Sequence, residues 1–116
     1  MHYQVAPFSE VKLVRCTRGS VYDAIIDLRP ESATFKEHLG VNLSAENHKV
    51  LYVPEGCAHG FITLEDSTEV FYQMAEFYAP EHGRVVRWND PAFKISWPLL
   101  PIMMSERDRT CADFSL

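Results

Sequence analysis

The stretch VPEGCAHGF, at residues 53–61, combines turn formers and a histidine at a spacing that can serve chemistry. Pro54 and Gly56 predict a tight turn, and His59 follows at the start of an apolar run typical of a strand. An imidazole at a strand end can bind a metal, contact a ligand, or form a hydrogen bond inside the fold. The spacing alone leaves these three roles open for His59.

A metal site needs further ligands, and the chain offers few of them near its start. Zinc, iron and manganese sites are built from several nitrogen, sulfur or carboxylate ligands. The early segment HYQ supplies only His2 and Gln4, without a His-x-His pair. We therefore expect no bound metal and no other cofactor, while a metal-binding protein with unrelated chemistry remains an alternative.

The composition indicates a folded, acidic protein. A chain of 116 residues suggests one domain, covering 1–116, and a hydrophobic fraction of 47% can fill its core. The net charge of −5 argues against nucleic acid as a partner, because nucleic-acid binders carry a basic surface. Cys16, Cys57 and Cys111 are odd in number and far apart, which favours reduced thiols. With no signal sequence and no apolar run of ~20 residues, we expect a cytoplasmic protein without a membrane partner.

Alternating apolar and polar residues predict strands along most of the chain. Lys12, Val14 and Cys16 share one face of the first clear strand, which favours an inward position for Lys12. Strands are expected at residues 11–17, 21–29, 35–43, 50–54, 59–64 and 68–74, and a helical turn at residues 104–108. Short strands separated by Gly and Pro predict an all-β jelly-roll barrel or β-sandwich, with little strand material before Val11.

Several motifs occur together in one order: KLVR, DxxxDLR, LSAEN, PEGxAHGF, YxPEH, RWNDP and S-E-x-D. In these motifs, and from His2 to Asp108, the chain resembles the dTDP-4-dehydrorhamnose 3,5-epimerases. The resemblance implies a metal-free cupin jelly roll that works as a homodimer on a nucleotide-linked 4-keto-6-deoxy sugar. Members of that family carry more chain before the histidine, so an N-terminally shortened member is expected.

The chemistry implied by the resemblance is the removal and return of a proton next to a ketone. To move such a proton, an enzyme needs a base that is active near pH 7, a positive or hydrogen-bonding group at the ketone oxygen, and an acid on the opposite face. By resemblance, His2 is the base and Asp108 the carboxylate that orients and charges its imidazole. Lys12 resembles the enolate stabiliser, and Tyr72 resembles the opposite-face acid.

Three further residues are expected to bind substrate. His59 is expected to contact the sugar or the phosphate, Tyr78 to line the nucleotide end, and Gln4 of the HYQ segment to contact substrate as well. The run RWNDP indicates a structural turn instead, with Asp90 in an Asx-type role.

Each catalytic role has an ordinary structural alternative when residue type alone is considered. Most lysines are solvated, so Lys12 can be a surface residue of a strand. Tyr72 can be a core tyrosine among apolar neighbours, and Asp108 can be a surface residue at a helix end. Asp23 and Asp27 alternate with apolar residues, and the sequence does not say which of them faces the interior.

The sequence therefore predicts an epimerase of a nucleotide-linked 4-keto-6-deoxy sugar, acting at C3, C5 or both, in deoxysugar biosynthesis of the rhamnose type. Besides the metal-binding protein named above, two alternatives remain open. One is a single-carbon epimerase or ketoisomerase of the same substrate class, and the other is a non-catalytic cupin that binds sugar nucleotides. Tyr72 favours true epimerisation, because inversion requires an acid on the second face.

Overall fold

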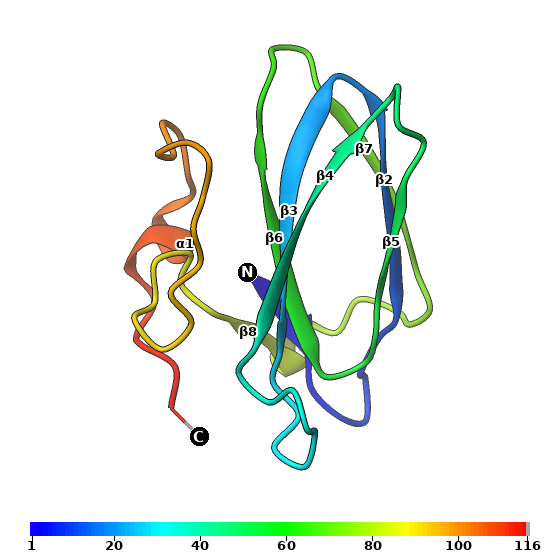
Figure 1. Ribbon diagram of the computed structural model, residues 1–116. Coiled ribbons are helices and arrows are strands. Elements are labelled where there is room, and N and C mark those ends of the chain that lie inside the picture. Colours follow the sequence, from blue (N-terminus) through cyan, green and yellow to red (C-terminus); the bar gives the residue numbers. More distant parts are fainter. Residues whose placement is uncertain (116) are drawn as a thin grey trace.

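Two antiparallel β-sheets form the fold in the computed structural model, which describes residues 1–115 (Figure 1). The larger sheet has the strand order β4-β3-β6-β1-β8, and the smaller sheet has the order β5-β2-β7. The strands are β1 (His2–Gln4), β2 (Lys12–Arg18), β3 (Ser20–Asp27), β4 (His38–Ser44), β5 (Val50–Val53), β6 (Cys57–Thr63), β7 (Glu69–Met74) and β8 (Gly83–Val85). The two sheets face each other, which confirms the all-β prediction.

Side chains that alternate along the strands fill the space between the sheets. On β2, Val14 and Cys16 are buried together with Lys12, as the sequence pattern predicts. The inner core is made of Val14, Cys16, Val21, Leu43, Val53 and Cys57. Full burial of one such aliphatic side chain contributes about 1.5–3 kcal/mol to folding. Because Lys12 shares a strand face with core residues, its side chain lies inside the fold rather than on the surface.

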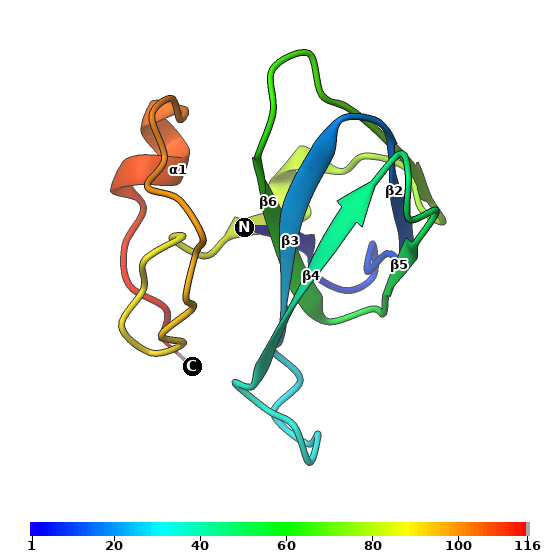
Figure 2. The same cartoon turned by 45° about the horizontal axis from the view of Figure 1, so that its top comes forward.

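A second core covers the outer face of the larger sheet. Ala24 and Ile26 alternate with the inner residues of β3, and they pack with Leu28, Ala58 and Phe93. The chain that follows β8 runs beside this sheet, and its last part, coloured orange to red, carries α1 (Glu106–Thr110) (Figures 1 and 2). This packing holds the C-terminal segment next to the sheet that contains β1.

Asp90 fixes the path of that C-terminal segment. Its Oδ1 accepts a hydrogen bond from the backbone N–H of Ala92 at 2.9 Å, and its Oδ2 accepts one from the N–H of Phe114 at 2.6 Å. The indole N–H of Trp97 donates to the carbonyl of Trp88 at 2.8 Å. The predicted Asx-type role of Asp90 is therefore confirmed, and its carboxylate also anchors the end of the chain.

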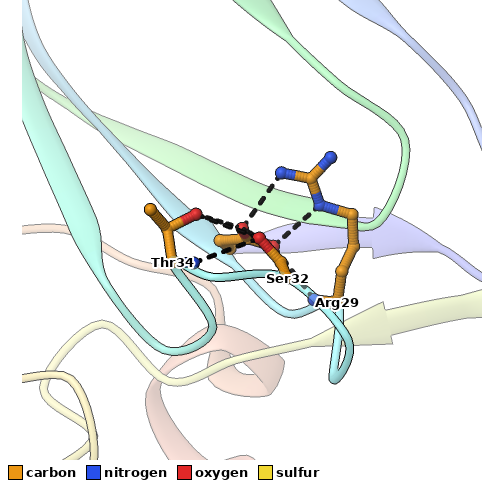
Figure 3. A network of polar contacts seen from close by, with 4 residues as sticks. Arg29, Ser32 and Thr34 are labelled. Carbon is orange, nitrogen blue, oxygen red and sulfur yellow. Dashed lines mark hydrogen bonds and ion pairs between the residues drawn. The ribbon is translucent and has the colours of Figure 1, made fainter.

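Asp27, at the end of β3, forms a polar clamp with Arg29, Ser32 and Thr34, the three residues labelled in Figure 3. Its carboxylate accepts hydrogen bonds from the backbone N, Nε and Nη2 of Arg29 and from the hydroxyls of Ser32 and Thr34, the last two at 2.6 Å. The hydrogen bonds from Arg29, with those from Ser32 and Thr34, hold the pKa of Asp27 well below its usual value. The DLR motif therefore has a structural role, because it closes the loop between β3 and β4.

The observed strands differ from the predicted ones mainly at their ends. The strand expected at residues 35–43 begins only at His38, because the residues before it form turns and Lys36 has a φ of 71°. The strands β1 and β8 were absent from the prediction, since three residues are too few to establish an alternating pattern. Both nevertheless pair in the larger sheet, with His2 opposite Val85.

The helical elements are short. The predicted helical turn at residues 104–108 is displaced, because Ser105 caps α1 by accepting a hydrogen bond from the backbone N–H of Asp108 at 3.2 Å. A 3₁₀ turn, η1 (Pro80–His82), precedes β8. No helix within residues 1–115 is long and apolar enough to cross a membrane.

Candidate active site

A cleft of about 810 Å³ is lined by residues of both sheets and by the C-terminal segment. This volume lies in the range of sites that bind small organic ligands. Its walls come from β1, β2, β6, β7 and β8, and from the segment 97–108. All the residues that the sequence singled out for catalysis or substrate binding line it: His2, Gln4, Lys12, His59, Tyr72, Tyr78 and Asp108.

His2 and Asp108 meet at one end of this cleft although 106 positions separate them in the chain. Strand β1 holds His2 opposite His59 of β6, and α1 carries Asp108. The distance from Nε2 of His2 to Oδ1 of Asp108 is 2.7 Å. An ionised carboxylate only accepts hydrogen bonds, so Nε2 carries the proton and Nδ1 keeps the lone pair. Nδ1 is therefore the atom of His2 that can accept a proton.

The electrostatic surroundings keep His2 uncharged and Asp108 charged at neutral pH. Burial lowers the pKa of His2, and the amino group of Met1 acts in the same direction, while Asp108 opposes both. Burial acts to raise the pKa of Asp108, but His2, the amino group of Met1 and the hydrogen bond from Ser105 together outweigh it and lower that pKa. An uncharged imidazole beside a carboxylate is the state that a general base requires.

Lys12 is a buried cation in the same cleft. It lies at the first position of β2, opposite Val53 of β5 and Met74 of β7. Its side chain is 9% exposed, and Nζ lies 3.3 Å from Oε1 of Glu10. A buried ammonium at the wall of a cleft can stabilise negative charge on a ligand oxygen, because the surroundings screen it poorly.

Tyr72 faces the cleft from the smaller sheet. It lies directly opposite Val14 on β2, so its side chain shares the inward face with Lys12 and Val14. Tyr72 is 49% exposed, whereas Val14 is fully buried. The core-tyrosine alternative therefore does not describe it, because half of its surface remains open at the cleft.

His59 is held from behind by a buried carboxylate. Its Nδ1 lies 3.2 Å from both oxygens of Asp23, and both residues are buried. Burial raises the pKa of Asp23, and the hydrogen bond to His59 counteracts it. This contact occupies Nδ1 and leaves Nε2 of His59 as the ring nitrogen that can turn toward a ligand. Of the two acidic residues left open by the sequence, Asp23 is the one that contacts a cleft residue.

Gln4 and Tyr78 also line the cleft. The side-chain amide of Gln4 donates to the carbonyls of Phe8 and Phe77, and its oxygen accepts from the N–H of Ala79 at 2.8 Å. Gln4 therefore fixes the backbone around Tyr78, whose side chain is 76% exposed. The geometry gives Gln4 a role in positioning this segment, and its predicted contact with substrate stays a prediction.

Sequence reasoning missed Glu10, which is buried and lines the cleft next to Lys12. The signal was present, because Glu10 and Lys12 are two positions apart in an extended segment and so share a side. No group of three or more His, Cys, Asp or Glu side chains within residues 1–115 is arranged to hold a metal ion.

Known protein sequences resemble this chain over most of its length. The family profile described as dTDP-4-dehydrorhamnose 3,5-epimerase matches residues 1–115. The chain is 44% identical over 108 residues to the dTDP-4-dehydrorhamnose 3,5-epimerase of Shigella flexneri, and 46% identical over 110 residues to that of Pseudomonas aeruginosa. The alignments cover 93% and 94% of this chain and 60% of each relative, so the chain spans about 60% of the length of these curated relatives.

Solved structures agree with the sequence comparison. The dTDP-4-dehydrorhamnose 3,5-epimerase of Bacillus anthracis, with TDP and PPi bound, superposes with a TM-score of 0.94 at 42% identity. That match covers 97% of this chain and 65% of the other. The dTDP-6-deoxy-D-glucose-3,5-epimerase of Legionella pneumophila, in complex with dTDP-4-keto-L-rhamnose, gives a TM-score of 0.87 at 36% identity, over 92% of this chain and 57% of the other.

Proposed function

Because the chain belongs to the dTDP-4-dehydrorhamnose 3,5-epimerase family, we propose that it epimerises a nucleotide-linked 4-keto-6-deoxy sugar at C3, C5 or both. The observation that carries the proposal is the 2.7 Å contact between His2 and Asp108 in a cleft that also contains Lys12 and Tyr72. The name and bound ligand of the Legionella relative support a dTDP-linked keto sugar as the substrate class. The reaction belongs to deoxysugar biosynthesis of the rhamnose type.

In the proposed first step, a C–H bond next to the ketone breaks. Its proton passes to Nδ1 of His2, and its electron pair forms an enolate with negative charge on the ketone oxygen. Asp108 stabilises the imidazolium that results and keeps the ring in the required tautomer. The buried Nζ of Lys12 donates a hydrogen bond to the enolate oxygen, where the charge develops.

Inversion requires the proton to return from the opposite face. Tyr72 lies on the smaller sheet, whose inner face looks toward the larger sheet that carries His2. In the proposed second step, the Tyr72 hydroxyl gives its proton to carbon, the C–H bond re-forms, and the ketone is restored. Water then reprotonates the half-exposed Tyr72, and the imidazolium of His2 releases its proton to water.

The remaining parts of the substrate are assigned to the other cleft residues. His59, held through Nδ1 by Asp23, contacts the sugar or phosphate through Nε2. Tyr78 lies at the exposed side of the cleft and lines the nucleotide end. Gln4 contributes mainly through its hydrogen bonds to the backbone near Tyr78.

A homodimer is proposed as the working form. Apolar side chains on the outer face of the smaller sheet support it: Leu13, Tyr52 and Phe71 are 40%, 57% and 46% exposed. Leu13 lies directly opposite Tyr52, so the two form one continuous surface. Sedimentation equilibrium should give twice the chain mass, and a monomer throughout the micromolar range would contradict this part of the proposal.

The proposed activity is tested by proton NMR in deuterated water with dTDP-4-keto-6-deoxyglucose as substrate. Enzyme-dependent loss of the C3 or C5 proton signal, with appearance of the inverted sugar, is the expected result. The carbon that loses its proton tells a 3,5-epimerase from a single-carbon epimerase. A folded sample at high concentration that binds the nucleotide sugar without any exchange would contradict the proposed reaction.

A further inference from the structure

Glu10 and Lys12 form a buried ion pair at the wall of the cleft. Taken as whole residues, Glu10 is 8% exposed and Lys12 is 7% exposed, and both line the cleft. Oε1 of Glu10 lies 3.3 Å from Nζ of Lys12. An ammonium has three N–H donors and this contact engages one of them, so Lys12 has donor capacity left for a ligand.

The second carboxylate oxygen of Glu10 is unsatisfied. Oε2 is buried, and no hydrogen-bond donor reaches it from the part of the chain that the structure describes, residues 1–115. A buried carboxylate oxygen without a donor is costly, and native proteins retain such an atom where it has a function. Because Glu10 lines the cleft, a bound ligand can supply the missing donor.

We propose that Glu10 and Lys12 together bind an α-hydroxy ketone. Lys12 donates to the ketone oxygen, and Oε2 of Glu10 accepts a hydrogen bond from the hydroxyl on the neighbouring carbon, the C3 hydroxyl of the sugar. The proposal rests on the proposed function, since the ketone is that of its substrate. Adjacent ketone and hydroxyl oxygens match an adjacent donor and acceptor on the protein.

The charges at this position fit a hydroxyl better than other ligand groups. A carboxylate only accepts hydrogen bonds, so it repels a phosphate and favours a neutral donor. The terminal torsion of a glutamate side chain is broad, so the Glu10 carboxylate can turn Oε2 toward a ligand while Oε1 stays near Lys12. Glu10 is therefore a specificity-determining residue, because it distinguishes sugars with a C3 hydroxyl from 3-deoxy sugars.

The test compares two substrates, dTDP-4-keto-6-deoxyglucose and its analogue without the C3 hydroxyl. The measured quantity is kcat/KM for deuterium incorporation next to the ketone, at C3 or C5, for the unaltered protein, Glu10→Gln and Glu10→Ala. We expect the unaltered protein to prefer the hydroxylated substrate by roughly 10- to 100-fold. Glu10→Gln should weaken this preference and Glu10→Ala should abolish it, even where the loss of a partner for Lys12 slows both substrates. Glu55→Gln, at an exposed glutamate outside the cleft, is the matched control and should keep the preference.

The outcomes separate this inference from the proposed function. If both Glu10 variants slow the two substrates equally and keep the original preference, the hydroxyl contact is refuted while the epimerase activity stands. If the unaltered protein prefers neither substrate, the inference is refuted as well. If the unaltered protein exchanges no proton of either substrate, the proposed function fails, and the assignment of Glu10 fails with it.

Discussion

Replacing Asp108 by asparagine removes the negative charge beside His2 and nearly keeps the side-chain shape. The 2.7 Å contact to Nε2 is a charge-assisted hydrogen bond, and the two side chains are 50% and 30% exposed. Hydrogen bonds to charged groups contribute about 1.5–3 kcal/mol, and solvent access places this one near 1.5–2 kcal/mol. If the contact strengthens as His2 becomes charged, Asp108→Asn lowers kcat/KM roughly 10- to 30-fold.

The same substitution shifts the pH dependence in a defined direction. Burial lowers the pKa of His2, and Asp108 raises it, so the pKa of His2 falls further when the carboxylate is removed. A base works in its uncharged form, so kcat/KM declines as the pH drops through the pKa of His2. The acid side of the profile should therefore move to lower pH in Asp108→Asn, while its plateau is reduced.

The assay is the initial rate of deuterium incorporation next to the ketone, at C3 or C5, measured by NMR across about pH 5–8, where histidines titrate. Asp66→Asn, at an exposed loop position, is the matched control and should leave both the plateau and the acid side unchanged. Thermal unfolding of each variant verifies that the fold is intact. An Asp108→Asn protein with the original plateau and the original acid side would refute the assignment of Asp108.

Two further substitutions test other parts of the account. Tyr72→Phe should slow formation of the inverted sugar roughly 100-fold while proton loss to His2 continues; equal slowing of both, read from the substrate and product signals, would remove the acid role of Tyr72. Asp27→Asn should lower the free energy of unfolding by about 2–3 kcal/mol at pH 7, because hydrogen bonds from Arg29 and two hydroxyls lose a charged acceptor. The pKa of Asp27 in the fold lies below its ordinary value of 3.8. The difference in unfolding free energy between the two proteins should therefore be complete above pH 3.8 and shrink as the pH falls below it. Urea unfolding that gives the same difference at every pH would contradict the role of Asp27.

Strand positions with a clear alternating pattern could be predicted from the sequence. The pattern of β2 places Lys12 on the face of Val14 and Cys16, and the structure buries all three. Strand β1 could not be predicted in this way, because three residues are too few to show an alternating pattern. The strand forms by pairing with β6 and β8.

Contacts between distant parts of the chain could not be derived from residue patterns. Asp108 alone has the properties of a surface residue in a short helix, and it meets His2 only because the outer core fixes the C-terminal segment. The pairing of His2 with Asp108 was predicted from the resemblance to the epimerase family and not from the pattern of residues. The buried Oε2 of Glu10 likewise depends on which groups surround it in space, which the sequence does not reveal. The hydrogen bonds of Gln4 to the backbone near Tyr78 are of the same kind.

The most direct test of the central claim compares the unaltered protein with His2→Asn in deuterated water, with dTDP-4-keto-6-deoxyglucose as substrate. Asparagine keeps a polar side chain at position 2 but provides no base. We expect deuterium incorporation next to the ketone by the unaltered protein, and none by His2→Asn, while both proteins unfold at similar temperatures. Incorporation by His2→Asn at the rate of the unaltered protein would contradict the assignment of His2 as the base.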